Sequence, residues 1–169
     1  IKPVVGDNVR FTVLDETALE GNIDKILPRK NVLIRPASAN VDQALVVFAI
    51  TQPDPNFNLL DRFLIMMLAQ DIPVTICFNK TDLENGAKQQ EYRSIYEQAG
   101  YPVMFVSTYE KSGVEAVRDY LRGKTTILAG PSGVGKSSLT NLLQPEAAME
   151  TGSISETLKR GKHNTRHAE

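Results

Sequence analysis

The chain beyond its first 36 residues alternates between short apolar runs and segments with helical spacing. Four runs are almost wholly apolar, as in strands buried on both faces: 45–50, 74–78, 103–106 and 125–129. Between and after them we expect helices over 59–68, 92–99 and 113–121, and a fourth helix through Leu139 and Leu142. Strands that alternate with helices predict an α/β fold with a mostly parallel sheet. Binding loops are then expected at the carboxyl ends of the strands.

The first 36 residues have a different pattern. Short β-prone stretches are interrupted by glycine and proline, and 31–35 is expected as a strand that leaves the region. The stretch is too short to close a barrel alone. We therefore expect residues 1–36 to be part of a small, oligonucleotide-binding-like (OB-like) β-barrel, and residues 37–169 to form the α/β domain.

Composition limits the class of protein only weakly. The 169 residues are 41% hydrophobic and 23% charged, which suffices for one core and a smaller appendage. A formal net charge of -1 gives no global attraction to nucleic acid. A basic patch lies in 159–167, and a solvated loop is the alternative interpretation of it.

No apolar run approaches the roughly 18 residues that a membrane span requires, and no charged-then-apolar leader begins the chain. We expect a soluble, cytoplasmic protein with no membrane partner. Cys77, inside the run 74–78, is expected to be a buried strand residue. One cysteine and two histidines allow neither an intrachain disulfide nor a zinc cluster in this chain.

The strand expected at 125–129 leads directly into a phosphate-loop sequence, G-x-x-x-x-G-K-[ST]. It consists of Gly130, Pro131, Ser132, Gly133, Val134, Gly135, Lys136, Ser137 and Ser138. Glycines let backbone amides converge on phosphate oxygens, and the following helix adds its N-terminal dipole. Lys136 is expected to reach the terminal phosphates, and the Ser137 hydroxyl to bind Mg²⁺. The alternative is a glycine-rich turn without a ligand.

The segment Asn79-Lys80-Thr81-Asp82 follows the run 74–78 and matches N-K-x-D. The Asp82 carboxylate can accept hydrogen bonds from the ring N–H and the exocyclic amine of guanine, which adenine lacks. Lys80 is expected to pack its stem along the base, and Asn79 to join the loops. The alternative is a polar turn in which Asp82 caps a helix.

Ser107 and Thr108 follow the run 103–106 at the position where a third loop would approach the base. They are similar to an S-A-K loop whose backbone contacts the guanine oxygen, although Thr108 replaces the alanine and lysine appears only at Lys111. We include both among the expected nucleotide-binding residues because of their place in the chain.

The two main motifs occur in reversed order, because Asn79 precedes Lys136. Domain termini commonly lie close together, so a chain opened at another point can build the same sheet and the same site. We therefore predict a circularly permuted P-loop GTPase domain that binds GTP or GDP with Mg²⁺.

The chain resembles the circularly permuted GTPases of the RsgA/YjeQ type, which depend on the small ribosomal subunit. Besides the two motifs, the resemblance rests on three short segments, residues 5–7, 35–43 and 161–165. The last of these is similar to a G-R-H-T-T-T switch segment, although Lys162 stands where arginine is usual. It implies that Thr165 binds Mg²⁺ and that His163 assists the attacking water. A basic contact to RNA phosphate is the alternative for His163.

The resemblance also implies what this chain does and what it lacks. It implies a GTP hydrolase that binds the small ribosomal subunit and its rRNA late in assembly, and we expect a monomer. The family's Asp-x-x-Gly segment and zinc-binding domain would follow Glu169, so zinc is expected only outside this chain, and this chain alone is expected to bind nucleotide but hydrolyse it poorly. The alternatives are an ATP-using P-loop enzyme and an RNA-binding module with structural nucleotide.

Overall fold

The computed structural model describes residues 2–145, 154–155 and 160–161. It divides into two compact units, of which the first ends at Val41 and the second begins at Asp42. Of the helices in this described part, none is long and apolar enough to cross a membrane.

The first unit is built from antiparallel strands. Strands β1 (Val9–Asp15) and β2 (Glu20–Ile26) form a hairpin, and β3 (Val32–Leu33) pairs with β4 (Ser38–Ala39). These strands agree with the expected part of a small β-barrel.

The strand expected at 31–35 was too long, because only Val32 and Leu33 are extended and paired. The chain turns immediately afterwards, and Ile34 is 82% exposed. Pro36 has no amide hydrogen to donate to a ladder, which favours a turn at this point over a longer strand.

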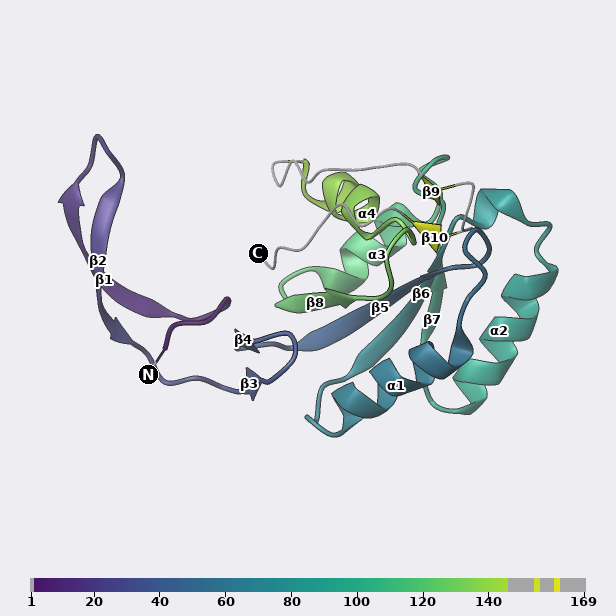
Figure 1. Ribbon diagram of the computed structural model, residues 1–169, viewed down its shortest axis with the longest axis horizontal. Helices are drawn as coiled ribbons and strands as arrows, with labels where there is room; N and C mark the ends of the chain where they lie inside the picture. Colours follow the sequence, from purple (N-terminus) through teal and green to yellow (C-terminus); the bar gives the residue numbers. More distant parts are fainter. Residues whose placement is uncertain (1, 146–153, 156–159, 162–169) are drawn as a thin grey trace. The chain divides into compact units, whose positions relative to one another are not determined.

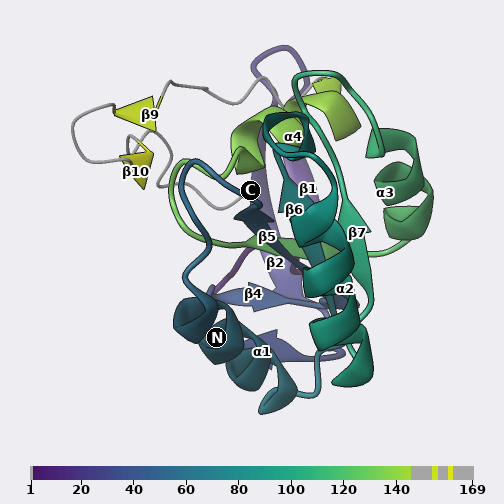
Figure 2. The same cartoon turned by 90° about the vertical axis from the view of Figure 1, so that its right-hand side faces the viewer.

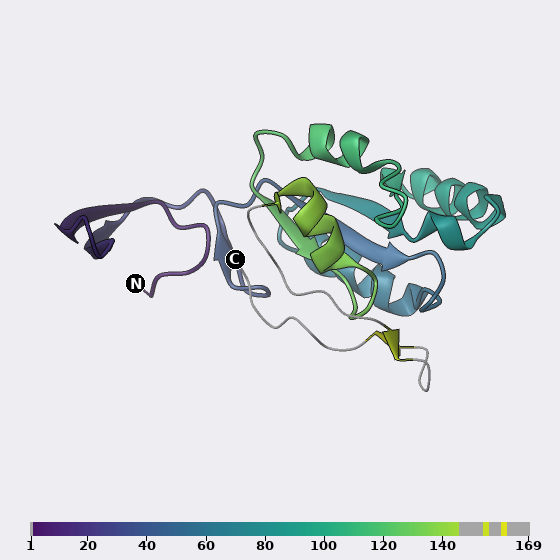
Figure 3. The same ribbon diagram turned by 90° about the horizontal axis from the view of Figure 1, so that it is seen from above.

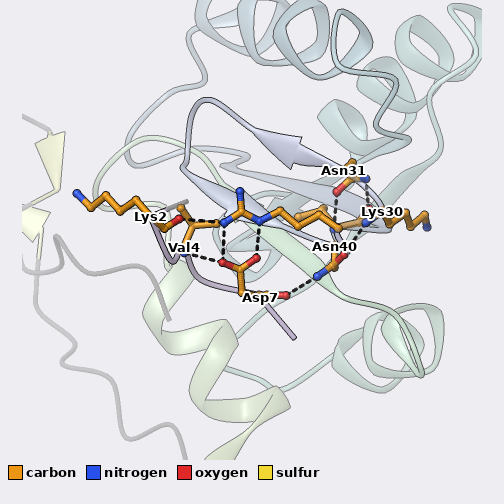
Figure 4. A network of polar contacts seen from close by, with 9 residues as sticks. Lys2, Val4, Asp7, Lys30, Asn31 and Asn40 are labelled. Carbon is orange, nitrogen blue, oxygen red and sulfur yellow. Dashed lines mark hydrogen bonds and ion pairs between the residues drawn. The ribbon is translucent and has the colours of Figure 1, made fainter. Parts of the chain in front are cut away.

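A clasp of polar contacts joins 2–7 to 29–41 within the first unit (Figure 4). Arg29 donates to both carboxylate oxygens of Asp7, at 2.6 and 2.7 Å, and to the Lys2 carbonyl at 3.0 Å. Asn40 completes the clasp, since its side chain accepts from the Lys30 amide at 2.7 Å and donates to the Gly6 carbonyl at 2.8 Å.

The second unit contains a four-stranded sheet in the order β7-β6-β5-β8, with every neighbouring pair parallel (Figure 1). The strands are β5 (Gln43–Ala49), β6 (Val74–Asn79), β7 (Val103–Phe105) and β8 (Thr126–Ala129). All residues of β5 and β6 are buried, which explains their unbroken apolar pattern. The sheet confirms the predicted α/β class.

In the described part of the chain, the α-helices α1 (Phe57–Leu68), α2 (Ala87–Gln98), α3 (Val114–Leu121) and α4 (Lys136–Leu143) and the 3₁₀ turn η1 (Thr81–Leu83) accompany the sheet. A short antiparallel pair, β9 (Ile154–Ser155) and β10 (Arg160–Gly161), is also described. All four predicted helices are present.

Helices α1 and α2 lie side by side (Figure 2) and pack on the sheet through aromatic rings. Phe57 of α1 contacts the rings of Tyr92 and Tyr96 of α2 at 5.1 and 6.3 Å between centroids. Both tyrosines contact Phe78 of β6. Ile95, which lies between the two tyrosines in sequence, is 52% exposed.

Helices α3 and α4 share a second apolar core with the sheet. It includes Leu45 and Cys77 of the central strands, Val117 of α3 and Leu139 of α4, all with no exposed surface. Burial raises the pKa of the Cys77 thiol to about 12, so this cysteine is a core residue, as the sequence predicted. Covering the sheet in this way leaves the loops at the carboxyl ends of the strands to form a site.

Candidate nucleotide-binding site

The phosphate-loop sequence lies where β8 passes into α4 (Figure 3). Its first glycine, Gly130, has φ +146° and lies against the neighbouring strand. A Cβ atom there would stand 2.1 Å from the carbonyl oxygen of Val47 in β5. The close approach of two backbones therefore requires glycine at this end of the loop.

Lys136 is the first residue of α4, and its side chain bonds back to the start of the phosphate loop. Its ammonium group donates to the carbonyl oxygens of Gly130 and Pro131 at 2.9 and 2.6 Å. Burial lowers the pKa of Lys136 from its ordinary value. A positive charge beside the N-terminus of a helix provides the electrostatic environment that phosphate requires. Ser137 is the next residue, in the first turn of α4.

Asn79, at the end of β6, joins the N-K-x-D segment to the phosphate loop. Its side chain has no exposed surface, and its amide donates to the carbonyl of Val134 at 2.8 Å. The same amide donates to the Thr108 hydroxyl at 3.3 Å, and its oxygen accepts from the Thr108 backbone N–H at 3.1 Å. One buried side chain therefore connects three loops from three strands.

Gly135 allows Asn79 to approach the phosphate loop. It has φ +93°, and a Cβ atom would stand 2.2 Å from the Asn79 side-chain nitrogen. A side chain at this position would push Asn79 away from Val134 in addition to straining the backbone.

Lys80 forms a second link between the same loops. It adopts a left-handed backbone conformation with φ +67°, and its ammonium group donates to the carbonyl of Gly133 at 2.7 Å and to the carbonyl of Gln52. Burial lowers the pKa of Lys80 to about 8, an effect opposed by the nearby Asp82 carboxylate. The far end of the lysine is thus held beneath the phosphate loop.

Asp82 lies in η1 and is half-buried. Its carboxylate accepts a hydrogen bond from the Ser107 hydroxyl at 2.5 Å. The next helix, α2, has Gly86 at its N-cap, so Asp82 does not cap it, contrary to the alternative interpretation of the motif. The remaining acceptor sites of the carboxylate border an open hollow that also includes Thr51 and Lys88.

The structure brings the three predicted nucleotide-binding segments, 79–82, 107–108 and 130–138, together at the carboxyl ends of β6, β7 and β8. Thr81 joins it through its backbone N–H, which donates to the Val106 carbonyl at 3.2 Å, and Ser132 and Ser138 lie half-buried in the phosphate loop and in α4. His163 and Thr165 lie outside the described residues. The sequence did not identify Gln52, whose carbonyl oxygen accepts a hydrogen bond from Lys80, because a backbone contact leaves no side-chain pattern.

Known proteins of one family are similar in sequence to this chain over its whole length. A family model described as RsgA GTPase matches residues 26–169. The chain is 62% identical over 169 residues to a small ribosomal subunit biogenesis GTPase RsgA of Agathobacter rectalis, and 52% identical to that of Alkaliphilus metalliredigens. Both alignments cover all of this chain but 56% and 58% of those proteins.

Solved structures show the same fold. YjeQ from Thermotoga maritima superposes with a TM-score of 0.74 at 34% identity, covering 90% of this chain and 55% of that one. YloQ, described as a circularly permuted GTPase, gives 0.69 at 40% identity, covering 89% of this chain and 53% of that one. The chain spans little more than half the length of these relatives. With its N-K-x-D segment placed before its phosphate-loop sequence and the two joined by hydrogen bonds, the chain belongs to the RsgA GTPase family.

Proposed function

We propose that this chain is the guanine-nucleotide-binding part of a GTP hydrolase that acts in the biogenesis of the small ribosomal subunit. The observation that carries the proposal is the Asn79 network, which holds a carboxylate suited to guanine beside a loop suited to phosphate. The relatives named for small ribosomal subunit biogenesis support the cellular role.

Asp82 selects the base in this proposal. Its carboxylate would accept from the ring N–H and the exocyclic amine of guanine, while the Ser107 hydroxyl steadies it at 2.5 Å. Adenine would leave the carboxylate without those donors, and the loss of such hydrogen bonds lowers affinity by roughly 10⁴-fold. Ser107 and Thr108 would bring the third loop to the edge of the base.

The residues 130–138 and Lys136 bind the phosphates. Backbone amides and the ammonium group would neutralise charge that develops as water attacks the terminal phosphorus and the bond to the bridging oxygen breaks, releasing GDP and phosphate. We assign to His163 the positioning of that water.

The donor set fits Mg²⁺, since Ser137 and Thr165 offer hydroxyl oxygens and this ion commonly takes one or two protein ligands besides phosphate and water. When bound, Mg²⁺ neutralises charge on the two outer phosphates. We assign zinc to the cysteine- and histidine-rich domain that the family resemblance places after this chain.

We further propose a monomeric, cytoplasmic protein that contacts rRNA. The basic residues Lys159, Arg160, Lys162, Arg166 and His167 would meet RNA phosphates, and Thr165 would order this segment when the terminal phosphate is present. Nucleotide state and ribosome binding would be coupled in this way.

Hydrolysis assays on a longer protein that includes the following domain test the proposal. We expect isolated small ribosomal subunits to raise GTP turnover, large subunits not to do so, and Lys136→Ala to lower turnover by about 10²-fold or more. Thr165→Ala should abolish the preference of the GTP form over the GDP form for the small subunit. Equal turnover of ATP, or no response to small subunits, would refute the proposal.

A further inference from the structure

The amino ends of β5 and β8 are joined by side-chain hydrogen bonds as well as by the ladder between the strands. The Asp42 N–H donates to the Thr125 carbonyl at 2.9 Å, and the Asp42 carboxylate accepts from the Thr125 N–H at 2.8 Å. The Gln43 side chain donates to the Thr126 hydroxyl at 3.0 Å and accepts from the Lys124 ammonium group at 3.3 Å. We call these contacts of 42–43 with 124–126 the amino-end clamp.

Gln43 is a polar residue in an otherwise apolar, buried strand. All seven residues of β5 are buried, and Gln43 is only 3% exposed. Burying a side-chain amide is unfavourable unless its hydrogen bonds are made. In the observed register Gln43 lies opposite Thr126, whose hydroxyl accepts from it. A shift of two residues would place Lys124 or Leu128 opposite Gln43 and remove that partner.

The apolar residues alone do not determine how β8 pairs with β5. Residues 44–49 of β5 are all apolar, and within the described part of the chain β5 is the only strand that pairs with the four-residue β8. A slip of two residues toward Ala49 would therefore keep β8 against apolar neighbours. Because a strand rises about 3.3 Å per residue, this slip would move the phosphate-loop sequence about 7 Å along the sheet.

We infer that Asp42 and Gln43 are positioning residues of the nucleotide site, which fix the register of β8 on β5 and so hold the phosphate loop where Asn79 binds it. The inference rests on the proposed function, because it requires the loop to bind phosphate. The clamp lies at the amino end of β8 and the loop follows its carboxyl end, so the clamp acts through the strand and does not touch the ligand.

Affinities for pyrophosphate and GDP test this role. Asp42→Ala removes the acceptor of the Thr125 N–H and should weaken both ligands by the same factor, because the contacts to the base are unchanged. We expect about tenfold, which corresponds to a correctly paired population of about one tenth. Asp42→Asn keeps an acceptor oxygen and should restore most of the affinity. Gln43→Leu places an apolar side chain at a buried position, so it should fold and still weaken pyrophosphate.

Thr75→Val is the matched control. Thr75 is 1% exposed near the amino end of β6, and its hydroxyl donates to the Tyr120 hydroxyl at 2.6 Å. The strand β6 is separated from β8 by β5. Loss of this buried hydrogen bond should lower stability and leave pyrophosphate affinity unchanged.

Amide hydrogen exchange shows whether the effect is local to β8. In Asp42→Ala the amides of β8 should exchange faster, while those of β6 should keep the rate of the wild type. A general loss of stability would speed exchange in both strands and would overturn the inference.

The affinities also distinguish failure of this inference from failure of the proposed function. If the wild-type chain binds both ligands and Asp42→Ala binds them equally well, the ladder alone fixes the register and the inference is refuted. Equal losses in Asp42→Ala and Thr75→Val, or an Asp42→Asn variant as weak as Asp42→Ala, would also refute it. If the wild-type chain binds neither pyrophosphate nor GDP, the proposed function itself fails, and the role of the clamp in nucleotide binding fails with it.

Discussion

At the scale of single residues, the site depends on contacts that join motifs far apart in the chain. The Asn79 amide and the Val134 carbonyl are 55 positions apart in sequence and 2.8 Å apart in space. Each motif can be recognised from its own residues, because phosphate requires glycines and a lysine and guanine requires a carboxylate. The N-K-x-D motif predicted that Asn79 joins the loops, but its partners Val134 and Thr108, and the role of the Gln52 carbonyl, depend on how the strands are placed, so the sequence could not predict them.

The steric contact at Gly135 predicts the effect of one methyl group. Gly135→Ala places a Cβ atom 2.2 Å from the Asn79 side chain, so we expect GDP affinity to fall by about tenfold or more. Gly86→Ala is the matched control, because Gly86 has nearly the same φ, +94°, but a Cβ there meets nothing within 4 Å.

Both variants should lose about 1–2 kcal/mol of unfolding free energy through the left-handed backbone, Gly135→Ala should lose more because it also displaces Asn79, and only Gly135→Ala should lose GDP binding. Calorimetric titration with GDP and urea unfolding give the two quantities. Equal GDP affinities in the two variants would contradict the importance of the Asn79 contact.

At the scale of elements, the sheet could be predicted well from the sequence and the first unit less well. The strands β5, β6, β7 and β8 each lie within two residues of the predicted runs, because burial on both faces leaves a continuous apolar pattern. Only two residues of the strand expected at 31–35 are paired, because the chain turns before Ser38 despite the high β-propensity of this stretch. Helical periodicity placed α2 but did not show that Ile95 on this helix is 52% exposed.

The packing of α2 predicts a large difference between two residues of one helix. Tyr92→Ala removes a ring that contacts Phe57 and Phe78, so it should cost about 3 kcal/mol of unfolding free energy. Ile95→Ala, at a position that is 52% exposed, should cost about 0.5 kcal/mol. Urea unfolding measures both costs, and similar values would show that the aromatic cluster does not hold α2 in place.

The clasp in the first unit predicts a dependence of stability on acid pH. Hydrogen bonds from Arg29 and from the Val4 amide hold the pKa of Asp7 below its ordinary value of 3.8. The folded state therefore binds fewer protons than the unfolded state just below pH 4, and stability rises with pH in that window. The contribution is complete above about pH 4 and is lost as pH falls through the folded pKa.

Unfolding free energies of the wild-type chain and Asp7→Asn between pH 6 and pH 3 check this sign. The advantage of the wild type should be constant down to about pH 4 and should shrink below it. An advantage that grows on acidification would show that the clasp does not depend on the charge of Asp7.

At the scale of the whole molecule, permutation leaves the proposed nucleotide site assembled, while the residues that we propose for catalysis come late in the chain. The described network joins the segments that we propose to bind the base and the phosphates, but Thr165 and His163 follow it in sequence, and the relatives are nearly twice as long. We therefore predict that this chain binds GDP but turns GTP over at least tenfold more slowly than a longer protein, because positioning and charge neutralisation supply most of the catalysis. Multiple-turnover phosphate release measures this, and equal rates would refute it.

Competition between GDP and ADP, with and without Mg²⁺, on the wild-type chain and Asp82→Ala is the most direct test of the central claim that this is a guanine-nucleotide site. We predict that the wild type prefers GDP by roughly 10⁴-fold and that the preference collapses in Asp82→Ala. Equal binding of GDP and ADP by the wild type would contradict the account and favour an ATP-using enzyme.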